Sequence, residues 1–346
     1  MRASAEFRKA PRDLGFGAGK GERMMNSQQR VASAIRGLPT DRTPIYGWLF
    51  MNLKQQIANA FGSVEAFEDR YEFDMAHLFG GPSPFDYERY EQLRREEGEL
   101  TPDLALSVPL TDPNAMELYE DIRAGLAHHK QRGRFCYVQT PGFFENFNGI
   151  FGIENQLCYT ILYREELREL YRRQAQWTKR FAENCIELGA DMIHISDDWG
   201  AQRSLLFSDE TWRDLIYPPM KEVVDFVHSR GAFVSLHSDG CVASVAGGIA
   251  ELGIDMVHPW QESAGMTYEL YLREFAGRFA LLGGVCIQTS LGFGRYAQLE
   301  ADIRRVFSLL RGKRWVCCTT HFVQEHCSME ELQFAYDLIY RLAREG

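Results

Sequence analysis

Short apolar runs alternate with longer stretches of helical periodicity along most of the chain. The run Met192–Ser196 is almost continuously apolar, which is typical of a strand buried on both faces of a parallel sheet. The stretch Glu165–Leu188 before it has the spacing of an amphipathic helix, and Gly189 follows as a stop signal. The other predicted strands are Ile45–Phe50, Phe73–Phe79, Phe135–Thr140, the first part of Phe233–Gly240, Met256–Gln261, Phe279–Cys286 and Trp315–Thr320.

Helical patterns separate most of these strands. The least regular part is Pro82–Pro113, where we expect a hairpin-like excursion or lid. The further predicted helices are Ser27–Gly37, Asn52–Phe61, Val64–Tyr71, Met116–Arg132, Asp209–Arg230, Val242–Leu252, Tyr268–Phe275, Tyr296–Leu310 and Met329–Arg344. Eight strands alternating with helices predict a single-domain (β/α)8 TIM barrel, whose active site forms at the carboxyl ends of the strands. A doubly wound open sheet is the alternative, but no glycine-rich fingerprint follows the first strand.

Composition narrows the class of protein further. A length of 346 residues suits one α/β barrel, and a net charge of −10 argues against a nucleic-acid partner. No apolar run reaches the ~20 residues that a membrane helix needs. The cysteines show no paired framework, which fits a reducing cytoplasm.

The first 25 residues differ from the rest. They are basic and rich in glycine but contain no apolar core, so they do not form a secretory signal. We expect a disordered leader over residues 1–25, with Met24 or Met25 as the alternative start, and the barrel domain over residues 26–346.

Polar side chains gather where the predicted strands end. Asp197 and Asp198 come directly after Met192–Ser196, and two adjacent carboxylates resist joint ionisation. A chain tolerates such a pair where a cation, a proton or a substrate group is held. The polar residues that follow other predicted strands are His237, Asp239, Gln261 and His321. In a barrel these ends face one site.

Each of these side chains also has a structural interpretation. Asp197 and Asp198 would serve equally as caps of the following turn. Asp239 precedes a glycine, as turn residues often do, and His237 would fit a core position.

Several ordered motifs identify a resemblance. PGFFENFNGIFG from Pro141, GADMIHISDDWGAQ, LHSDG and ELGIDMVHPWQ together resemble the uroporphyrinogen decarboxylase superfamily. The resemblance implies a (β/α)8 barrel with a deep site at the carboxyl ends of the strands. It also implies one of two activities: porphyrinogen decarboxylation, or methyl transfer involving corrinoid proteins, coenzyme M or tetrahydrofolate.

The decarboxylase branch fits poorly. Those enzymes grip the carboxylates of their substrate with arginines after the first strand, whereas Tyr46–Asn52 contains none. Only His321 matches the late histidine of that branch. A decarboxylase acting on a tetrapyrrole or another carboxylated substrate therefore remains the alternative.

The methyltransferase branch fits better. It holds zinc with a His-x-Cys pair and a later cysteine. Here His237 is kept, Asp239 and His321 stand at the cysteine positions, and Asp197 stands at an acidic position. The resemblance thus implies a metal site of His237, Asp239, His321 and Asp197, which suits zinc or another divalent ion.

The resulting hypothesis is a methyltransferase that moves a methyl group between a small molecule and a corrinoid protein or tetrahydrofolate. A non-catalytic barrel that binds a corrinoid or a tetrapyrrole is a second alternative, and family relatives imply a homodimer. The expected catalytic residues are Asp197, Asp198, His237 and His321. The expected substrate-binding residues are Glu145, Asn148, Trp199, Gln202, Trp260 and Gln261, although the two tryptophans would also suit the core.

Overall fold

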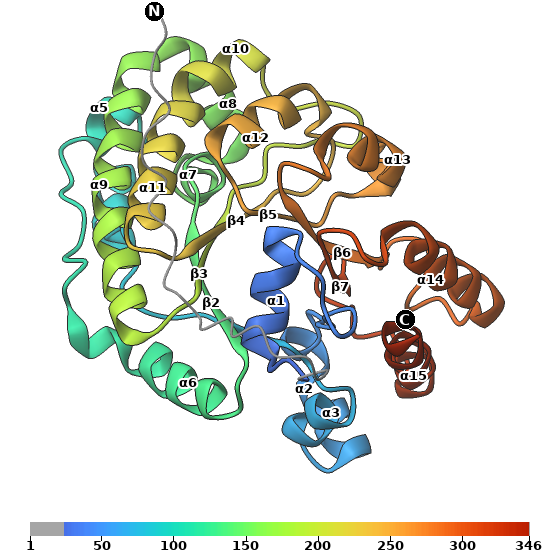
Figure 1. Cartoon of the computed structure of the whole chain (residues 1–346). Coiled ribbons are helices and arrows are strands. Elements are labelled where there is room, and N and C mark those ends of the chain that lie inside the picture. Colours follow the sequence, from blue (N-terminus) through green and yellow to red (C-terminus); the bar gives the residue numbers. More distant parts are fainter. Residues whose placement is uncertain (1–23, 346) are drawn as a thin grey trace, which may run out of the picture.

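The computed structural model describes residues 24–345, and seven parallel strands form its centre. Each strand pairs with the next in sequence, so the sheet order is β1 to β7, and the sheet curls as Figure 1 shows. The strands are β1 (Met75–Leu78), β2 (Phe135–Pro141), β3 (Met192–Ser196), β4 (Phe233–His237), β5 (Met256–His258), β6 (Ala280–Val285) and β7 (Trp315–Thr319). This arrangement is consistent with a TIM-like barrel in a single domain.

The predicted first strand, Ile45–Phe50, is wrong in extent. Only Ile45 makes a parallel bridge, to Cys317 of β7, and Phe50 already begins a helix. The carbonyl of Ile45 also accepts a hydrogen bond from the N–H of Asp74, next to β1. The segment therefore lies between β7 and the residue before β1, in the position of the expected first strand of the barrel.

Helices cover the outside of the sheet, and α9 and α11 pack side by side there (Figure 1). Their amphipathic sequences bury one face each against the strands. The helices before β2 are α1 (Ser27–Arg36), α2 (Phe50–Phe61), α3 (Val64–Arg70), α4 (Tyr87–Glu97), α5 (Pro102–Ala105) and α6 (Glu120–Gln131). Those after β2 are α7 (Phe144–Phe151), α8 (Ile153–Leu162), α9 (Arg164–Leu188), α10 (Asp209–Thr211), α11 (Tyr217–Ser229), α12 (Ala246–Leu252), α13 (Tyr268–Leu270), α14 (Tyr296–Leu310) and α15 (Met329–Arg344).

The region Pro82–Pro113, expected as a hairpin-like excursion or lid, contains the helices α4 and α5 and no strand, so the hairpin form is wrong. Asp86 caps α4 by accepting a hydrogen bond from the N–H of Arg89, and Tyr90 and Leu93 are buried one turn apart. The cap and the helical spacing of the buried residues therefore determine the local structure. The many charged residues of this segment hid that helical pattern in the sequence.

Helix α1 closes the amino-terminal end of the barrel, and Figure 1 shows it in the middle of the ring of strands. Arg30 of α1 and Arg42 both pair with the fully buried Asp74, at 2.5 and 2.7 Å. The N–H of Ile45 donates to the same carboxylate. This network ties α1 and the Ile45 segment to the start of β1, which leaves the carboxyl ends of the strands as the open end.

The expected leader lies almost wholly outside the described residues. Met24 and Met25 precede α1, and the N–H of Met25 donates to Asp41. Among the described helices, none combines the length and apolar character needed to cross a membrane.

Candidate metal centre and the neighbouring cavity

Three side chains that follow strands β4 and β7 converge on one point. His237 is the last residue of β4, Asp239 lies two residues further on, and His321 lies just beyond β7. One ligand atom from each lies within 4.8 Å of the others. Asp239 Oδ1 is 3.8 Å from His237 Nε2, and Asp239 Oδ2 is 3.8 Å from His321 Nε2.

The spacing and chemistry of this group fit a divalent ion. Ligand atoms around a tetrahedral ion with bonds of about 2.0–2.2 Å lie roughly 3.3–3.6 Å apart, so these side chains need to draw together by about 1 Å or less to bind one. Asp239 Oδ1 is buried and has no hydrogen-bond partner among the described residues. Three protein ligands with one position open are typical of a catalytic rather than a structural zinc site.

A second histidine sets the protonation of His237. His258 Nε2 lies 3.0 Å from the carbonyl oxygen of Thr319, which can only accept, so His258 carries its proton on Nε2. Burial lowers the pKa of both His258 and His237, so each ring is neutral at pH 7. His258 Nδ1 is then an acceptor, and the Nδ1–H of His237 donates a hydrogen bond to it at 2.8 Å. His237 Nε2 therefore presents a lone pair to the group, as a metal ligand must.

Trp48 lies at the centre of these rings. Its indole stacks on His258 at 4.0 Å between centroids, and it lies 5.2 Å from His237 and 5.8 Å from His321. The backbone N–H of Trp48 donates to Thr319 Oγ1, which anchors the segment to β7. Neither Trp48 nor His258 was predicted from the sequence to belong to the site. His258 lies in the predicted strand Met256–Gln261, and it pairs with His237 of the neighbouring strand. Two histidines near the ends of consecutive predicted strands are the signal that would have found His258.

The two adjacent aspartates lie in different surroundings. Asp197 is fully buried, and its carboxylate accepts the N–H groups of Phe143 and Glu145 at the start of α7. It is not among the side chains that meet at the candidate metal centre. Asp198 instead faces that centre, with Oδ1 3.5 Å from His237 Nε2 and accepting from the N–H of Asp239. Asp197 thus positions α7, and Asp198 borders the site.

Negative charge accumulates beside the centre. Burial, and then Asp198 and Glu145, raise the pKa of Asp239 to about 7. Burial and Asp198 likewise raise the pKa of Glu145. Among the ion pairs of the described residues, none joins a lysine or arginine to these three carboxylates. A bound cation would relieve their mutual repulsion.

The expected substrate-binding residues lie in different surroundings. Glu145 lines an open cavity beside the centre, whereas Asn148, one turn further along α7, is not among its lining residues. The buried Asn148 Oδ1 has no partner among the described residues. Gln261 is buried and accepts a hydrogen bond from the N–H of Gly240, so it holds the loop that carries Asp239.

The remaining three do not reach the site. Trp199 is fully buried and packs against Trp212, so it belongs to the core rather than to a pocket wall. Trp260 is also core, because its ring contacts aromatic residues around β6 and its Nε1 donates to a backbone carbonyl. Gln202 is exposed and donates to the carbonyl of Ser263.

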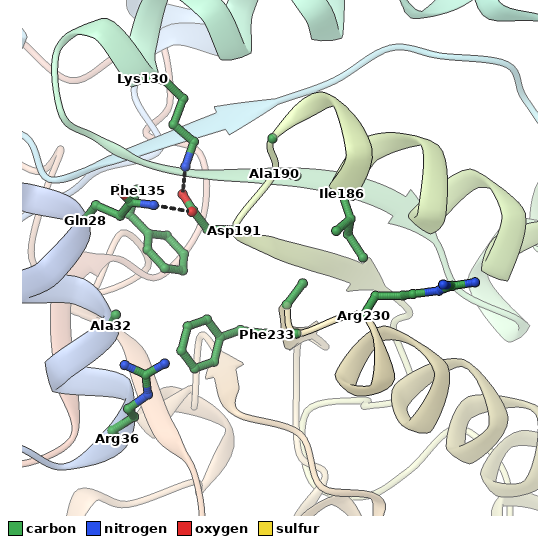
Figure 2. Close-up of a pocket in the computed structure, with 13 residues that line it drawn as sticks. Gln28, Ala32, Arg36, Lys130, Phe135, Ile186, Ala190, Asp191, Arg230 and Phe233 are labelled. Carbon is green, nitrogen blue, oxygen red and sulfur yellow. Dashed lines mark hydrogen bonds and ion pairs between the residues drawn. The ribbon is translucent and has the colours of Figure 1, made fainter. Parts of the chain in front are cut away.

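Another cavity, of about 170 Å³, lies at the opposite end of the barrel beneath α1 (Figure 2). Its polar groups bond to one another, since Asp191 accepts from Gln28 and pairs with Lys130. Arg36 lies over the ring of Phe233, 5.1 Å from its centroid. These contacts join α1 to the starts of the strands, and active sites of such barrels form at the other end.

The fold and the converging side chains define an α/β protein with a candidate metal site at the carboxyl ends of parallel strands. The family model for uroporphyrinogen decarboxylase (URO-D) matches residues 148–342, more than half of the chain. The chain therefore belongs to the URO-D family, as the motifs indicated. No curated protein matches it in sequence.

Solved structures extend the likeness at the level of the fold. A methyltransferase from Methanosarcina mazei is similar, with a TM-score of 0.64 and 12% identity over 91% of this chain and 98% of that chain. A B12-independent methionine synthase from Shewanella sp. W3-18-1 has a TM-score of 0.45 and 13% identity over 69% of this chain and 68% of that chain. At these identities the likeness concerns the fold alone.

Proposed function

We propose that this URO-D family member is a metal-dependent methyltransferase. It would move a methyl group between a small molecule and either a corrinoid protein or tetrahydrofolate. The observation that carries the proposal is the meeting of His237, Asp239 and His321, with the lone pair of His237 Nε2 turned towards the other two. The fold shared with the M. mazei methyltransferase is compatible with it.

The metal would be zinc or another divalent ion, held by His237, Asp239 and His321. When bound, such an ion acts as a Lewis acid on a heteroatom and makes that atom a better leaving group or nucleophile. Asp197 does not belong to this set, because both of its oxygens accept backbone N–H groups.

The protein's own groups would then manage protons and orientation. Asp198 lies next to His237 and is held by the N–H of Asp239, where a carboxylate can take or return a proton on the reacting heteroatom. Glu145, which interacts electrostatically with Asp198, borders the cavity that a small substrate would enter. Gln261 keeps Asp239 in position through the backbone of Gly240.

The surroundings of the centre do not favour a porphyrinogen decarboxylase. A tetrapyrrole with several carboxylates requires fixed cations, and neither lysine nor arginine is among the residues that line the cavity. The carboxylates of Glu145, Asp198 and Asp239 would repel such a substrate. A cytoplasmic location and a homodimer remain expectations from the sequence.

The test combines metal analysis with an assay of methyl transfer. We expect one equivalent of metal per chain, lost in His237→Ala and kept in His326→Ala, a matched histidine that is exposed and outside the group. Transfer from methylated corrinoid protein or methyltetrahydrofolate should fall with the metal. A parent protein that binds metal but moves no methyl group between any of these partners would refute the proposal.

A further inference from the structure

The open cavity beside the metal centre is lined by aromatic and acidic side chains. It has a volume of about 370 Å³ and lies at the ends of β2 and β3, between α4 and α7. Its lining residues are Phe79, Tyr87, Gln139, Pro141, Glu145, Asn146, Gly149 and Ser196. Aromatic rings and one carboxylate are present, and a basic side chain is not.

The two aromatic rings leave much of their surface uncovered. Phe79 is 41% exposed and Tyr87 is 45% exposed, although most large apolar side chains of the described residues are buried. His77 packs against Phe79 at 4.1 Å between centroids and holds it at the end of β1. Exposed aromatic faces beside a cavity offer a surface of negative quadrupole potential to a ligand.

Glu145 supplies the charge of this cavity. Ser196 Oγ donates to Glu145 Oε2 at 3.2 Å, which fixes the carboxylate at the end of β3. Asp198 and Asp239 lie close enough to interact electrostatically with it, so the negative potential extends from the cavity to the metal centre. An anionic ligand is therefore disfavoured, and a cationic one is attracted.

Asn146 contacts Tyr87 at the edge of the cavity. The hydroxyl of Tyr87 donates to Asn146 Oδ1 at 3.3 Å. Asn146 Nδ2 is buried and has no partner among the described residues. Because that nitrogen has almost no exposed surface, a ligand in the cavity does not reach it, and Asn146 acts by holding Tyr87 in place.

We propose that this cavity binds a small organic cation of the methylated-ammonium class. Its charged head would lie against the rings of Phe79 and Tyr87, with Glu145 as counter-charge. Aromatic faces and a carboxylate are the groups that recognise a quaternary ammonium, which cannot donate a hydrogen bond itself. The inference rests on the proposed methyl transfer, for which it names the class of small-molecule partner.

Binding to the full-length, metal-loaded protein tests this directly. Choline is the probe, and its neutral carbon analogue, in which carbon replaces the ammonium nitrogen, is the matched control for shape. Calorimetry should show saturable choline binding and an affinity for the analogue at least about tenfold lower. Equal affinity for the two compounds, or the absence of choline binding, would overturn the inference.

Variants locate the binding. Glu145→Gln should weaken choline binding at least about tenfold. Glu154→Gln, an exposed glutamate on the neighbouring helix, should leave it unchanged. Should Glu145→Gln fail to fold, Tyr87→Leu at an exposed position should give a similar loss. Unchanged binding in whichever of these variants folds would also overturn the inference.

The two proposals fail differently. Methyl transfer from a neutral donor without any choline binding would refute the cation site and leave the methyltransferase standing. Choline binding without transfer to any corrinoid or folate acceptor would support the cation site and count against methyl transfer.

Discussion

His237 and His258 meet through their Nδ1 atoms at 2.8 Å, so one ring must donate and the other accept. The carbonyl of Thr319 accepts a hydrogen bond from the protonated Nε2 of His258. His258 Nδ1 is therefore the acceptor of the pair, and His237 Nδ1 is the donor. His237 is left with an unprotonated Nε2 among the carboxylates of Asp198 and Asp239. A lone pair beside carboxylates is repulsive unless a cation lies between them.

The first prediction concerns His258 as a positioning residue. His258→Phe keeps a flat ring against Trp48 but removes the acceptor for the His237 proton. We expect zinc affinity to fall about 10- to 100-fold, the usual effect of losing the partner of a metal-bound histidine. Competition titration against a chromophoric chelator measures it.

A conservative variant separates this role from simple packing. His258→Asn retains an oxygen that can accept from His237, so it should recover part of the affinity. Thermal unfolding of the metal-free variants should be recorded alongside. Parental zinc affinity in a folded His258→Phe protein would show that the His237–His258 contact does not set the ligand.

The second prediction is a pH dependence of metal binding. The pKa of Asp239 is raised to about 7, and the ion must displace the proton that this carboxyl holds below that pH. The lowered pKa of His237 means that its ring is already neutral there. Zinc affinity should therefore be constant above pH ~7 and fall about tenfold per pH unit below it, as one competing proton requires.

The same shift has a consequence for the metal-free protein. For a carboxyl with a folded pKa raised from 3.8 to about 7, the contribution to stability is fully present below the unfolded value of 3.8 and is lost as pH rises from there to about 7. Asp239→Asn should remove that loss. Denaturant unfolding at several pH values compares the two proteins, and identical pH profiles would contradict the assignment.

The third prediction uses a close approach between two loops. A Cβ at Gly200 would lie 2.3 Å from the carbonyl oxygen of Asp239 and 2.6 Å from the N–H nitrogen of Cys241. Gly200→Ala should push the Asp239 loop away and lower zinc affinity. Gly247→Ala is the matched control, because a Cβ there meets nothing within 4 Å, and it should bind zinc normally. Equal zinc binding by both variants would contradict the role given to this approach.

For some elements, the first and last residues could be predicted from the sequence. The bounds expected for Met192–Ser196, Tyr296–Leu310 and Met329–Arg344 coincide with β3, α14 and α15. Their signals are strong: a buried apolar run in one case and clear helical periodicity in the others, with Ser328 capping α15. The helix α7 was missed because Phe144–Phe151 is short and ends at Gly152, so it has little periodicity to detect.

The segment Ile45–Phe50 shows why local pattern misleads. It is apolar because Trp48 lies in the barrel interior among histidine rings, and not because the segment is a full strand. The division of roles between Asp197 and Asp198 was equally hidden. It depends on where the chain turns after β3, and thus on the N–H groups of α7 that capture Asp197.

The last prediction concerns stability. Asp74 is fully buried between Arg30 and Arg42 and also accepts from the N–H of Ile45. Asp74→Ala leaves two buried guanidinium groups without their shared partner, and we expect a loss of about 3–5 kcal/mol in the free energy of unfolding. Denaturant unfolding, followed by fluorescence and by circular dichroism, measures it.

The control is an ion pair of similar chemistry on the surface. Glu165 pairs with Arg168, and its side chain is 79% exposed, so Glu165→Ala should change stability by less than about 0.5 kcal/mol. The contrast follows from solvent: water screens the exposed pair and replaces its contacts, whereas no water reaches the Asp74 carboxylate. Similar small losses in both variants would mean that α1 does not depend on Asp74 to close the barrel. In that case its packing against the strands would hold the amino-terminal end shut without the buried ion pairs.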